Sequence, residues 1–402
     1  MPGLAGLTLP LRYLRAELSA RRGFGRDERS GASVSRTAAL ALASCYGDRL
    51  GSSELRSLAR RCVIHREWRR VDHRDLVNGA HATRRLRMGP IEALAGSGRG
   101  AVVASIHLGP YLFVAGELLR SRLRVVAVAD DEVMDRDMRL WAENAHRVPG
   151  KLELLPVRGP GSLLRALRAL ESGAIVLVYV DGGNSVVGPG ARTPHQIEIP
   201  LGSLPVRFRS GAAYLAQRAQ APSFFAVARR DRRGGRDVEF SDPVPPPARD
   251  DAAGAAALMR TGAAWFARRI LDHPEQWLGW LIPLMAWAST GDAPTASREQ
   301  LERTRTRVRG LLADASGRAR LSADPVRVGA LHEGRDRILV DGPRRRVLAA
   351  TPLGVDVLRA AQRNVRFAEL SRRVSAEPGA LEWEVSRMVL AGLATIEAEG
   401  RA

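Results

Sequence analysis

The chain has 402 residues, of which 45% are hydrophobic and 26% are charged, and this composition excludes a disordered protein while leaving length for two or three domains. Its formal net charge is +19, and the excess comes from arginine because Lys151 is the only lysine. Such a charge favours anionic partners, among them phosphopantetheine carriers, acidic head groups, acidic peptides and nucleic acid.

Cysteine usage and hydropathy indicate the compartment. Cys45 and Cys62 are the only cysteines, which argues against a disulfide framework and for a reducing environment. The sequence has no apolar run of 18 residues. Leu4–Leu18 mixes apolar residues with arginine in a helical pattern, and we expect it to pack on the protein, with a membrane surface as the alternative. We therefore expect a cytoplasmic protein, either soluble or peripheral on the inner face of the cell membrane.

The spacing of apolar residues in the first half of the chain changes near residue 100. Residues 11–95 are predicted to be helical, because alanine, leucine and arginine recur at helical spacing. Beyond them, short apolar runs alternate with amphipathic stretches. The expected strands are Gly100–Ile106, Arg124–Ala129, Leu152–Val157, Ala174–Val180 and Ser223–Ala228. The expected helices are Pro110–Arg120, Asp135–Arg147, Ser162–Glu171, Gly211–Arg218 and Ala252–Leu271. This alternation is typical of an α/β fold, an open and largely parallel sheet flanked by helices.

The chain after this domain is predicted to form a linker and a small module. The predicted divisions are residues 1–290 (N-terminal helices over 1–95, α/β core over 96–290), a helical linker over 291–321 and a module over 322–402. We expect the first and last of these to fold and melt separately, because the arginine-rich linker lacks apolar residues to join their cores.

The module is predicted to be a hairpin followed by three helices. Asp341-Gly342-Pro343 is a hairpin signature, and Thr351-Pro352 fits the N-cap and N1 positions of a helix. The hairpin strands and the two later helices are expected at Arg337–Val340, Arg345–Ala349, Phe367–Val374 and Ala380–Gly392. This order is that of a winged-helix-like domain.

Titratable residues follow three of the predicted strands. Ligands of open α/β sheets bind at the carboxyl ends of parallel strands, where the sequence places His107, the pair Asp130 and Asp131, and Asp181. His107 lies at a sharp strand-to-helix turn, and an imidazole there can take a proton from an attacking hydroxyl or amine, since its ordinary pKa is near working pH. Capping of the next helix is the simpler interpretation of Asp130 and Asp131.

The segment around His107 resembles a known family. VVASIHLGPYLFVAGELL (Val102–Leu119) is similar to the strand–His–helix motif of lysophospholipid acyltransferases, in the branch of the late lauroyl- and myristoyl-type acyltransferases of lipid A biosynthesis. Three further segments follow in the family's order, and the resemblance covers roughly residues 40–290. They are VYVDGG (Val178–Gly183), Ile199–Arg230 and PEQWLGW (Pro274–Trp280).

The resemblance implies transfer of a fatty acyl group from an acyl thioester, on acyl carrier protein or coenzyme A, to a hydroxyl or amine. His107 would be the general base, with no cofactor and no metal, and the oxyanion would bind backbone N–H groups near Gly109 or Gly182. Other expected substrate contacts are Tyr111 in the same motif, the Gly182-Gly183 turn, and Arg207 and Arg209 for a phosphopantetheine phosphate. A plain turn and ordinary surface arginines are the simpler alternatives.

One position departs from the family. Its histidine is paired with an acid five residues on, where this chain has Leu112. Loss of such a partner costs about 10⁴ in rate in serine proteases, so either another acid orients the ring, the histidine works unaided, or the domain is an inactive acyl- or carrier-binding scaffold that recruits a partner. Among Asp130, Asp131 and Asp181 we prefer Asp181, whereas Glu117 and Asp135 are not expected to reach the ring.

The C-terminal module resembles PqqD-like peptide-recognition domains of ribosomal-peptide maturation. The resemblance lies in Asp336–Ala350 followed by TPLGVDVLRAAQ and FAELSRRV. It implies that a leader peptide, or a carrier protein, binds as an extra strand at the sheet edge. A DNA-binding winged helix has the same outline, and Arg344, Arg345 and Arg346 suit phosphates, an acidic leader or a solvated wing. We expect a peptide and not nucleic acid.

Two other residue types receive simpler interpretations. The histidines His65, His73 and His81 recur every eight residues, which is not the spacing of a helical metal site, and we expect them to be solvated. The tryptophans Trp277, Trp280 and Trp287 are expected in the core, with an acyl-chain wall or a membrane-facing edge as alternatives.

Overall fold

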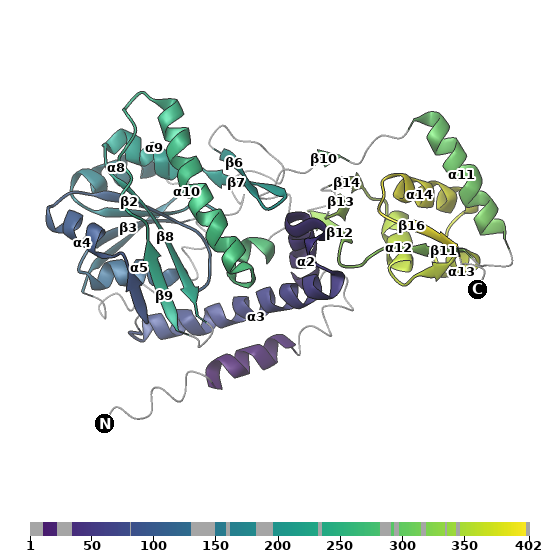
Figure 1. Ribbon diagram of the computed structural model, residues 1–402, viewed down its shortest axis with the longest axis horizontal. Helices are drawn as coiled ribbons and strands as arrows, with labels where there is room; N and C mark the ends of the chain where they lie inside the picture. The colour runs from purple at the N-terminus through teal and green to yellow at the C-terminus, as the bar shows by residue number, and fades with distance from the viewer. Residues whose placement is uncertain are drawn as a thin grey trace.

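The computed structural model describes most of the chain (Figure 1). The described residues are 11–21, 34–80, 82–129, 149–157, 161–181, 196–231, 235–281, 291–292, 297–314, 319–333, 336–342 and 346–398. Several predicted features lie outside them, namely the helix Asp135–Arg147 and residues Asp130, Asp131, Gly182, Gly183, Arg344, Arg345, His81 and Trp287.

The N-terminal region is mainly helical, as expected. A helix of residues 11–21 lies along α3, as Figure 1 shows, and is followed by α2 (Val34–Tyr46), α3 (Ser52–Val77) and α4 (Gly89–Gly96). The prediction is wrong at β1 (Arg84–Leu86), a short strand that pairs with β9 (Arg236–Phe240). Helix α3 ends before it because Gly79 adopts a left-handed φ of 87°, a conformation that only glycine adopts readily.

A seven-stranded sheet forms the centre of the molecule, in the order β1-β9-β8-β2-β5-β3-β4. Its other strands are β2 (Ala101–Ser105), β3 (Arg124–Ala129), β4 (Lys151–Pro156), β5 (Ile175–Tyr179) and β8 (Ser223–Arg230). Every pairing is parallel except that of β8 with β9. The predicted α/β class, a largely parallel sheet flanked by helices, is therefore confirmed.

Helices cover both faces of this sheet (Figure 1). Val102 and Ala104 of β2 point into one core together with α8 (Ser162–Glu171), α9 (Gly211–Ala219) and α10 (Ala252–Asp272), while Ala101 and Val103 point into the other with α5 (Leu112–Arg120). Burial on both faces explains why β2 is a continuous apolar run, as is usual for central parallel strands. A separate hairpin, β6 (Gln196–Leu201) with β7 (Leu204–Arg209), precedes α9.

The C-terminal region contains two small sheets and four helices in its described part. One sheet has the order β10-β14-β13-β12, and the other β15-β11-β16. The strands are β10 (Gly291–Asp292), β11 (Ala319–Ser322), β12 (Val328–Glu333), β13 (Asp336–Asp341), β14 (Arg346–Ala349), β15 (Val365–Arg366) and β16 (Thr395–Ala398). The helices are α11 (Arg298–Ala313), α12 (Pro352–Ala361), α13 (Phe367–Arg373) and α14 (Pro378–Leu390). The predicted hairpin is β13–β14, and the Thr351 hydroxyl caps α12 by accepting the Gly354 N–H at 2.9 Å.

The expected linker belongs largely to this module. Helix α11 packs against α14 and α13, and its Val308 is fully buried in the core of the module. Arg305 and Arg309 of α11 both bind Glu382 of α14, at 2.9 Å and 2.8 Å. Because α11 buries only one apolar side chain fully, its arginine-rich sequence shows little helical periodicity of apolar residues. Such a sequence favours a linker over a helix of the module core.

The module has a core of its own but also packs against the first domain, and whether the two melt separately stays a prediction. Val326 and Val340 belong to the same buried cluster as the α2 side chains. Gly329 of β12 lies against Leu40 of α2 so closely that an added Cβ would be 2.7 Å from its Cδ1. Arg327 donates a hydrogen bond to the Leu50 carbonyl oxygen at 3.0 Å. A truncation at residue 290 would therefore expose the α2 face.

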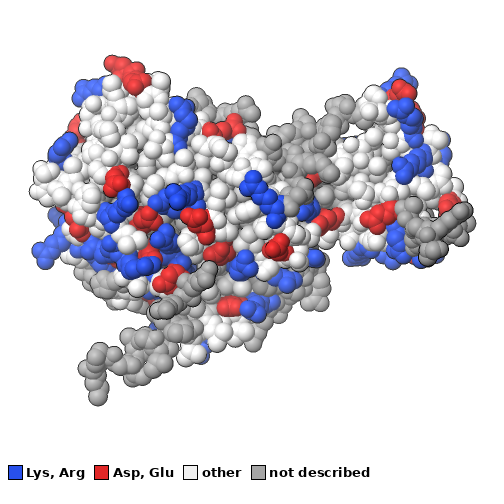
Figure 2. Space-filling view, in the orientation of Figure 1, with Lys and Arg blue, Asp and Glu red and all other residues white. Residues whose placement is uncertain are grey.

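Charge on the visible face is mixed and not segregated: Figure 2 shows arginine and acidic side chains interspersed across it. Within the described residues, no helix combines the length and the hydropathy that crossing a bilayer requires.

Candidate active site

The end of β2 places His107 at the carboxyl edge of the sheet. Its side chain is 25% exposed. The turn that follows is fixed by its backbone: the Leu108 N–H donates to the Ile106 carbonyl at 2.8 Å, and Gly109 has a left-handed φ of 54°. A Cβ at Gly109 would lie 2.8 Å from the Ala228 carbonyl oxygen, so only glycine fits this turn.

Asp181 lies opposite His107. The preceding residue, Val180, donates its backbone N–H to the Ser105 carbonyl oxygen at 2.9 Å. Strands β2 and β5 are adjacent and parallel, with Ser105 in register with Tyr179. The residues two positions on therefore meet at the edge of the sheet. Asp181 Oδ1 is 2.8 Å from His107 Nδ1, which confirms the predicted contact between this acid and the ring.

The other oxygen of this carboxylate is held by two donors. Asp181 Oδ2 accepts the backbone N–H of His107 at 2.9 Å and the indole N–H of Trp277 at 2.8 Å. Asp181 and Trp277 are both buried. With Oδ2 occupied, the plane of the carboxylate is fixed and Oδ1 is directed at the imidazole.

The Pro-Glu-Gln-Trp segment connects the His107 turn to strand β8 through hydrogen bonds. The Gln276 side chain donates to the Arg230 carbonyl at 3.0 Å and accepts the Arg230 N–H at 2.8 Å, so it closes the end of β8. The Gln276 carbonyl accepts the Gly109 N–H at 2.9 Å, and the Leu278 N–H donates to the His107 carbonyl at 3.0 Å. The Gly109 N–H is therefore engaged within the protein, so an oxyanion donor near Gly109 would have to be another N–H.

Two tyrosines form a wall beside the imidazole. The ring centroids of Tyr111 and Tyr179 lie 4.6 Å and 4.8 Å from that of His107. The Tyr179 hydroxyl donates to the Tyr111 carbonyl at 3.3 Å, and burial raises the pKa of Tyr179 well above its ordinary value. Arg69 of α3 donates to the Tyr111 hydroxyl at 3.5 Å. Tyr111 thus contacts the candidate base, and its expected contact with the substrate stays a prediction.

The other residues that the sequence singled out lie in different parts of the first domain. Leu112 packs into the apolar core that contains α5. Glu117 is buried and accepts the Ala82 N–H at 2.9 Å, which places it in a structural role as expected. The Arg209 N–H donates to the Val180 carbonyl at 2.9 Å, so the end of β7 reaches the strand end that carries Asp181. Arg207 lies two residues earlier, opposite Glu198 in the β6–β7 pair.

A buried charged cluster lies at the same edge. Asp72 of α3 is ion-paired with Arg230 and accepts a hydrogen bond from Arg236 at 2.9 Å, and Arg236 also pairs with Asp75. Tyr13, in the helix of residues 11–21, donates to Asp72 Oδ1 at 2.8 Å. Burial lowers the pKa of Arg230 to about 10, which leaves the guanidinium charged at neutral pH. The cluster joins α3 and the first helix to the ends of β8 and β9.

His65 of α3 is half-buried beside this cluster, which corrects the expectation that it is solvated. Burial, and then the positive charge of Arg230, lower its pKa to about 3. Its Nδ1 is buried and has no hydrogen-bond partner among the described residues, and its ring centroid is 4.6 Å from that of Trp68. His65 is therefore neutral at physiological pH. His73 is also half-buried.

The hydrogen bonds assign a tautomer to His107. A carboxylate can only accept, so Nδ1 carries the proton that binds Asp181 and Nε2 is left with its lone pair. Nε2 can take a proton from an O–H or N–H nucleophile, and Asp181 then stabilises the imidazolium. The sequence indicated His107 and Asp181. It did not indicate Trp277, Gln276 or Arg69, although the Pro-Glu-Gln-Trp motif contains the first two.

No protein-family model matches the chain, and no curated protein matches it. In the described residues, no group of three or more histidine, cysteine, aspartate or glutamate side chains is arranged to hold a metal ion.

Proposed function

We propose that the protein is an acyltransferase of the lysophospholipid acyltransferase type, similar to the late acyltransferases of lipid A biosynthesis, with a C-terminal PqqD-like module. The observation that carries the proposal is the contact between His107 and Asp181 at a sheet edge. It supplies the carboxylate that the sequence motif lacks at Leu112. The order of the four motif segments supports the same proposal.

The proposed reaction uses His107 Nε2 as the general base. As the acceptor hydroxyl or amine attacks the thioester carbonyl, Nε2 takes its proton and Asp181 stabilises the imidazolium. The tetrahedral intermediate then collapses, the C–S bond breaks, and the thiol leaves with the proton from the imidazolium. Its oxyanion needs N–H donors other than that of Gly109, and the Gly182 N–H remains our candidate. Arg209 is the candidate for the phosphate of the phosphopantetheine arm.

The test is thiol release from myristoyl-coenzyme A, with hydroxylamine as a small amine acceptor. We expect turnover by the full chain above the uncatalysed background, and its loss in His107→Ala with no change in melting temperature. Turnover retained in His107→Ala contradicts the mechanism. If neither protein turns over but both bind the acyl thioester, the alternative of a catalytically degenerate scaffold holds instead.

The C-terminal module is proposed to be winged-helix-like and to recruit a peptide or carrier protein. The order of its elements supports this assignment: three antiparallel strands, β12–β13–β14, are followed by helices α12, α13 and α14. The outer edge of β14, however, is paired in parallel with β10, with Gly291 opposite Arg346 and Asp292 opposite Val347. A peptide strand added at that edge would have to displace β10.

We also propose that the protein docks on the cytoplasmic face of the cell membrane through the helix of residues 11–21. Its Tyr13 face packs on α3, while Leu11, Leu14 and Leu18 are 59%, 50% and 45% exposed on the other side, as in interfacial amphipathic helices. Co-sedimentation with phosphatidylglycerol vesicles tests this: Leu14→Gln should weaken binding several-fold. Equal binding of both proteins contradicts it.

A further inference from the structure

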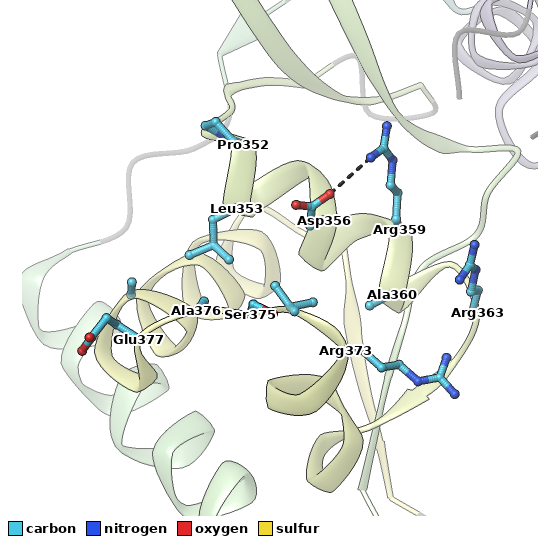
Figure 3. Close-up of a pocket in the computed structure, with 12 residues that line it drawn as sticks. Pro352, Leu353, Asp356, Arg359, Ala360, Arg363, Arg373, Ser375, Ala376 and Glu377 are labelled. Atoms are coloured by element: carbon cyan, nitrogen blue, oxygen red, sulfur yellow. Dashed lines mark hydrogen bonds and ion pairs between the residues drawn. The ribbon is translucent and has the colours of Figure 1, made fainter. Parts of the chain in front are cut away.

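A groove in the C-terminal module lies apart from the His107 site (Figure 3). Helix α12 forms one wall, and the end of α13, the connection to α14 and the first turn of α14 form the other. Its volume is about 960 Å³, at the upper end of the range for small-molecule sites and sufficient for a short peptide segment. Its lining residues are Pro352, Leu353, Asp356, Arg359, Ala360, Arg363, Arg373, Val374, Ser375, Ala376, Glu377 and Ala380.

Basic side chains line one end of the groove, and the other end carries apolar side chains together with Glu377. Figure 3 shows Arg359, Arg363 and Arg373 on one side, whereas Pro352 and Leu353 lie on the opposite side. The three arginines are exposed. Between the two ends the floor is made by small or buried apolar side chains, including Ala360 and Val374, and this is why the surface is hollow there.

The guanidinium groups are only partly neutralised. Arg359 is 3.2 Å from Asp356, and Arg373 is 3.1 Å from Glu369, both exposed pairs within one helix that contribute little to stability. No described residue forms an ion pair with Arg363. An incoming carboxylate can therefore bind Arg363 in bidentate fashion without breaking an existing pair, and can compete for the other two.

We propose that this groove binds an acidic peptide segment that also carries apolar side chains. Carboxylates of the peptide would contact Arg363, Arg359 and Arg373, and its apolar side chains would cover Leu353 and Ala380. The site is on the helical side of the module and needs neither the β14 edge, which β10 occupies, nor the acyl-transfer chemistry proposed for the other domain.

Charge and polarity at the groove favour a peptide over nucleic acid. Asp356 and Glu377 also line the groove, so its cations do not form the continuous row that a phosphate backbone needs, whereas a peptide can place single carboxylates opposite single arginines. The apolar end offers a nucleic acid no phosphate contact, whereas a peptide can place carboxylates at one end and leucine-like side chains at the other.

The experiment uses the full chain and a fluorescein-labelled synthetic peptide in which a run of glutamates precedes a run of leucines. Fluorescence anisotropy gives Kd for the wild type, for Arg363→Glu and for Ala380→Trp, which fills part of the groove from an exposed lining position. Arg372→Glu is the matched control, since Arg372 is an exposed neighbour that does not line the groove. We expect Kd to rise at least about tenfold in Arg363→Glu, the loss expected for one charge-assisted contact, and less than about threefold in the Arg372→Glu control. In Ala380→Trp we expect Kd to rise because the indole occupies space that the peptide needs.

Three results would overturn the proposal. The first is that the wild-type chain binds the peptide no more tightly than it binds a peptide with glutamine in place of glutamate. The second is an equal effect of Arg363→Glu and Arg372→Glu, which would mean that only overall charge matters. The third is tighter binding of a labelled DNA oligonucleotide that is lost in Arg363→Glu, which would make the groove a nucleic-acid site.

Discussion

The His107 site and the groove of the C-terminal module are built in different ways. At the His107 site nearly every polar contact involves a buried partner or the backbone: Asp181 is held by the His107 peptide N–H and by Trp277, and Gln276 closes the end of β8. In the groove, exposed arginines carry the charge on a floor of small side chains. The first arrangement fixes atoms in place before a ligand arrives, which suits chemistry. The second leaves charges free to adapt, which suits recognition of a peptide.

The largest effect expected from breaking the first arrangement is on turnover. Trp277→Phe removes one of the two donors to Asp181 Oδ2, and we expect turnover to fall about 10- to 100-fold, the equivalent of one hydrogen bond to a charged group. Trp280→Phe is the matched control, because its indole N–H binds the Pro274 carbonyl at 2.7 Å and not Asp181. The pH–rate profile should move in the first variant alone. Equal losses and unchanged profiles in both would show that Trp277 only packs.

A second variant tests whether the two regions share one folded body. Leu40 of α2 is fully buried against β12, so Leu40→Ala should lower the free energy of unfolding by ~2–5 kcal/mol. Because the contact joins both domains, the whole denaturation curve should shift as one transition, followed by circular dichroism. Leu18→Ala, at an exposed position, should change stability little. Two denaturation transitions, of which only one is shifted by Leu40→Ala, would show that the two domains unfold independently.

A pH-dependent effect is expected from His65, which lies near the buried Arg230. Its pKa of about 3 is below the ordinary value for the unfolded chain, so the unfolded state binds the extra proton first as pH falls. Stability should therefore decrease between about pH 6.5 and pH 3, by at most ~1.4 kcal/mol per pH unit from this residue. In His65→Gln the decrease should be shallower by that amount in urea denaturation at several pH values. Parallel curves for the two proteins would rule this out.

Sequence periodicity predicted the parts of the fold that bury apolar side chains in a regular pattern. The strands β2, β3 and β5 and the helices α8 and α10 lie within a residue or two of their predicted bounds. Strand β9, with the charged sequence RDVEF, and β1, with RRL, have no such pattern and were missed. Their positions depend on pairing with β8 and on ion pairs such as that of Arg84 with Asp237.

The sequence predicted which residues follow strands, but it did not predict the order of the strands in the sheet, and the choice of the acid beside His107 depends on that order. Asp130, Asp131 and Asp181 all follow strands, and periodicity could not say which strand lies beside β2. The sheet places β5 next to β2, with β3 one strand further away, and this adjacency brings Asp181 to the ring. Trp277 belongs to the Pro-Glu-Gln-Trp motif, but its hydrogen bond to Asp181 arises from tertiary packing between segments distant in sequence, and the motif alone could not reveal it.

The central claim is that Asp181 replaces the missing acid and orients His107 as a base, and Asp181→Asn tests it most directly. Asparagine keeps the size of the side chain, but its amide can donate to Nδ1 and favour the tautomer that protonates Nε2. With myristoyl-coenzyme A and hydroxylamine, we predict that turnover falls by about 10³–10⁴ while the melting temperature shows a folded protein. Turnover near the wild-type rate in a folded Asp181→Asn protein would contradict the claim.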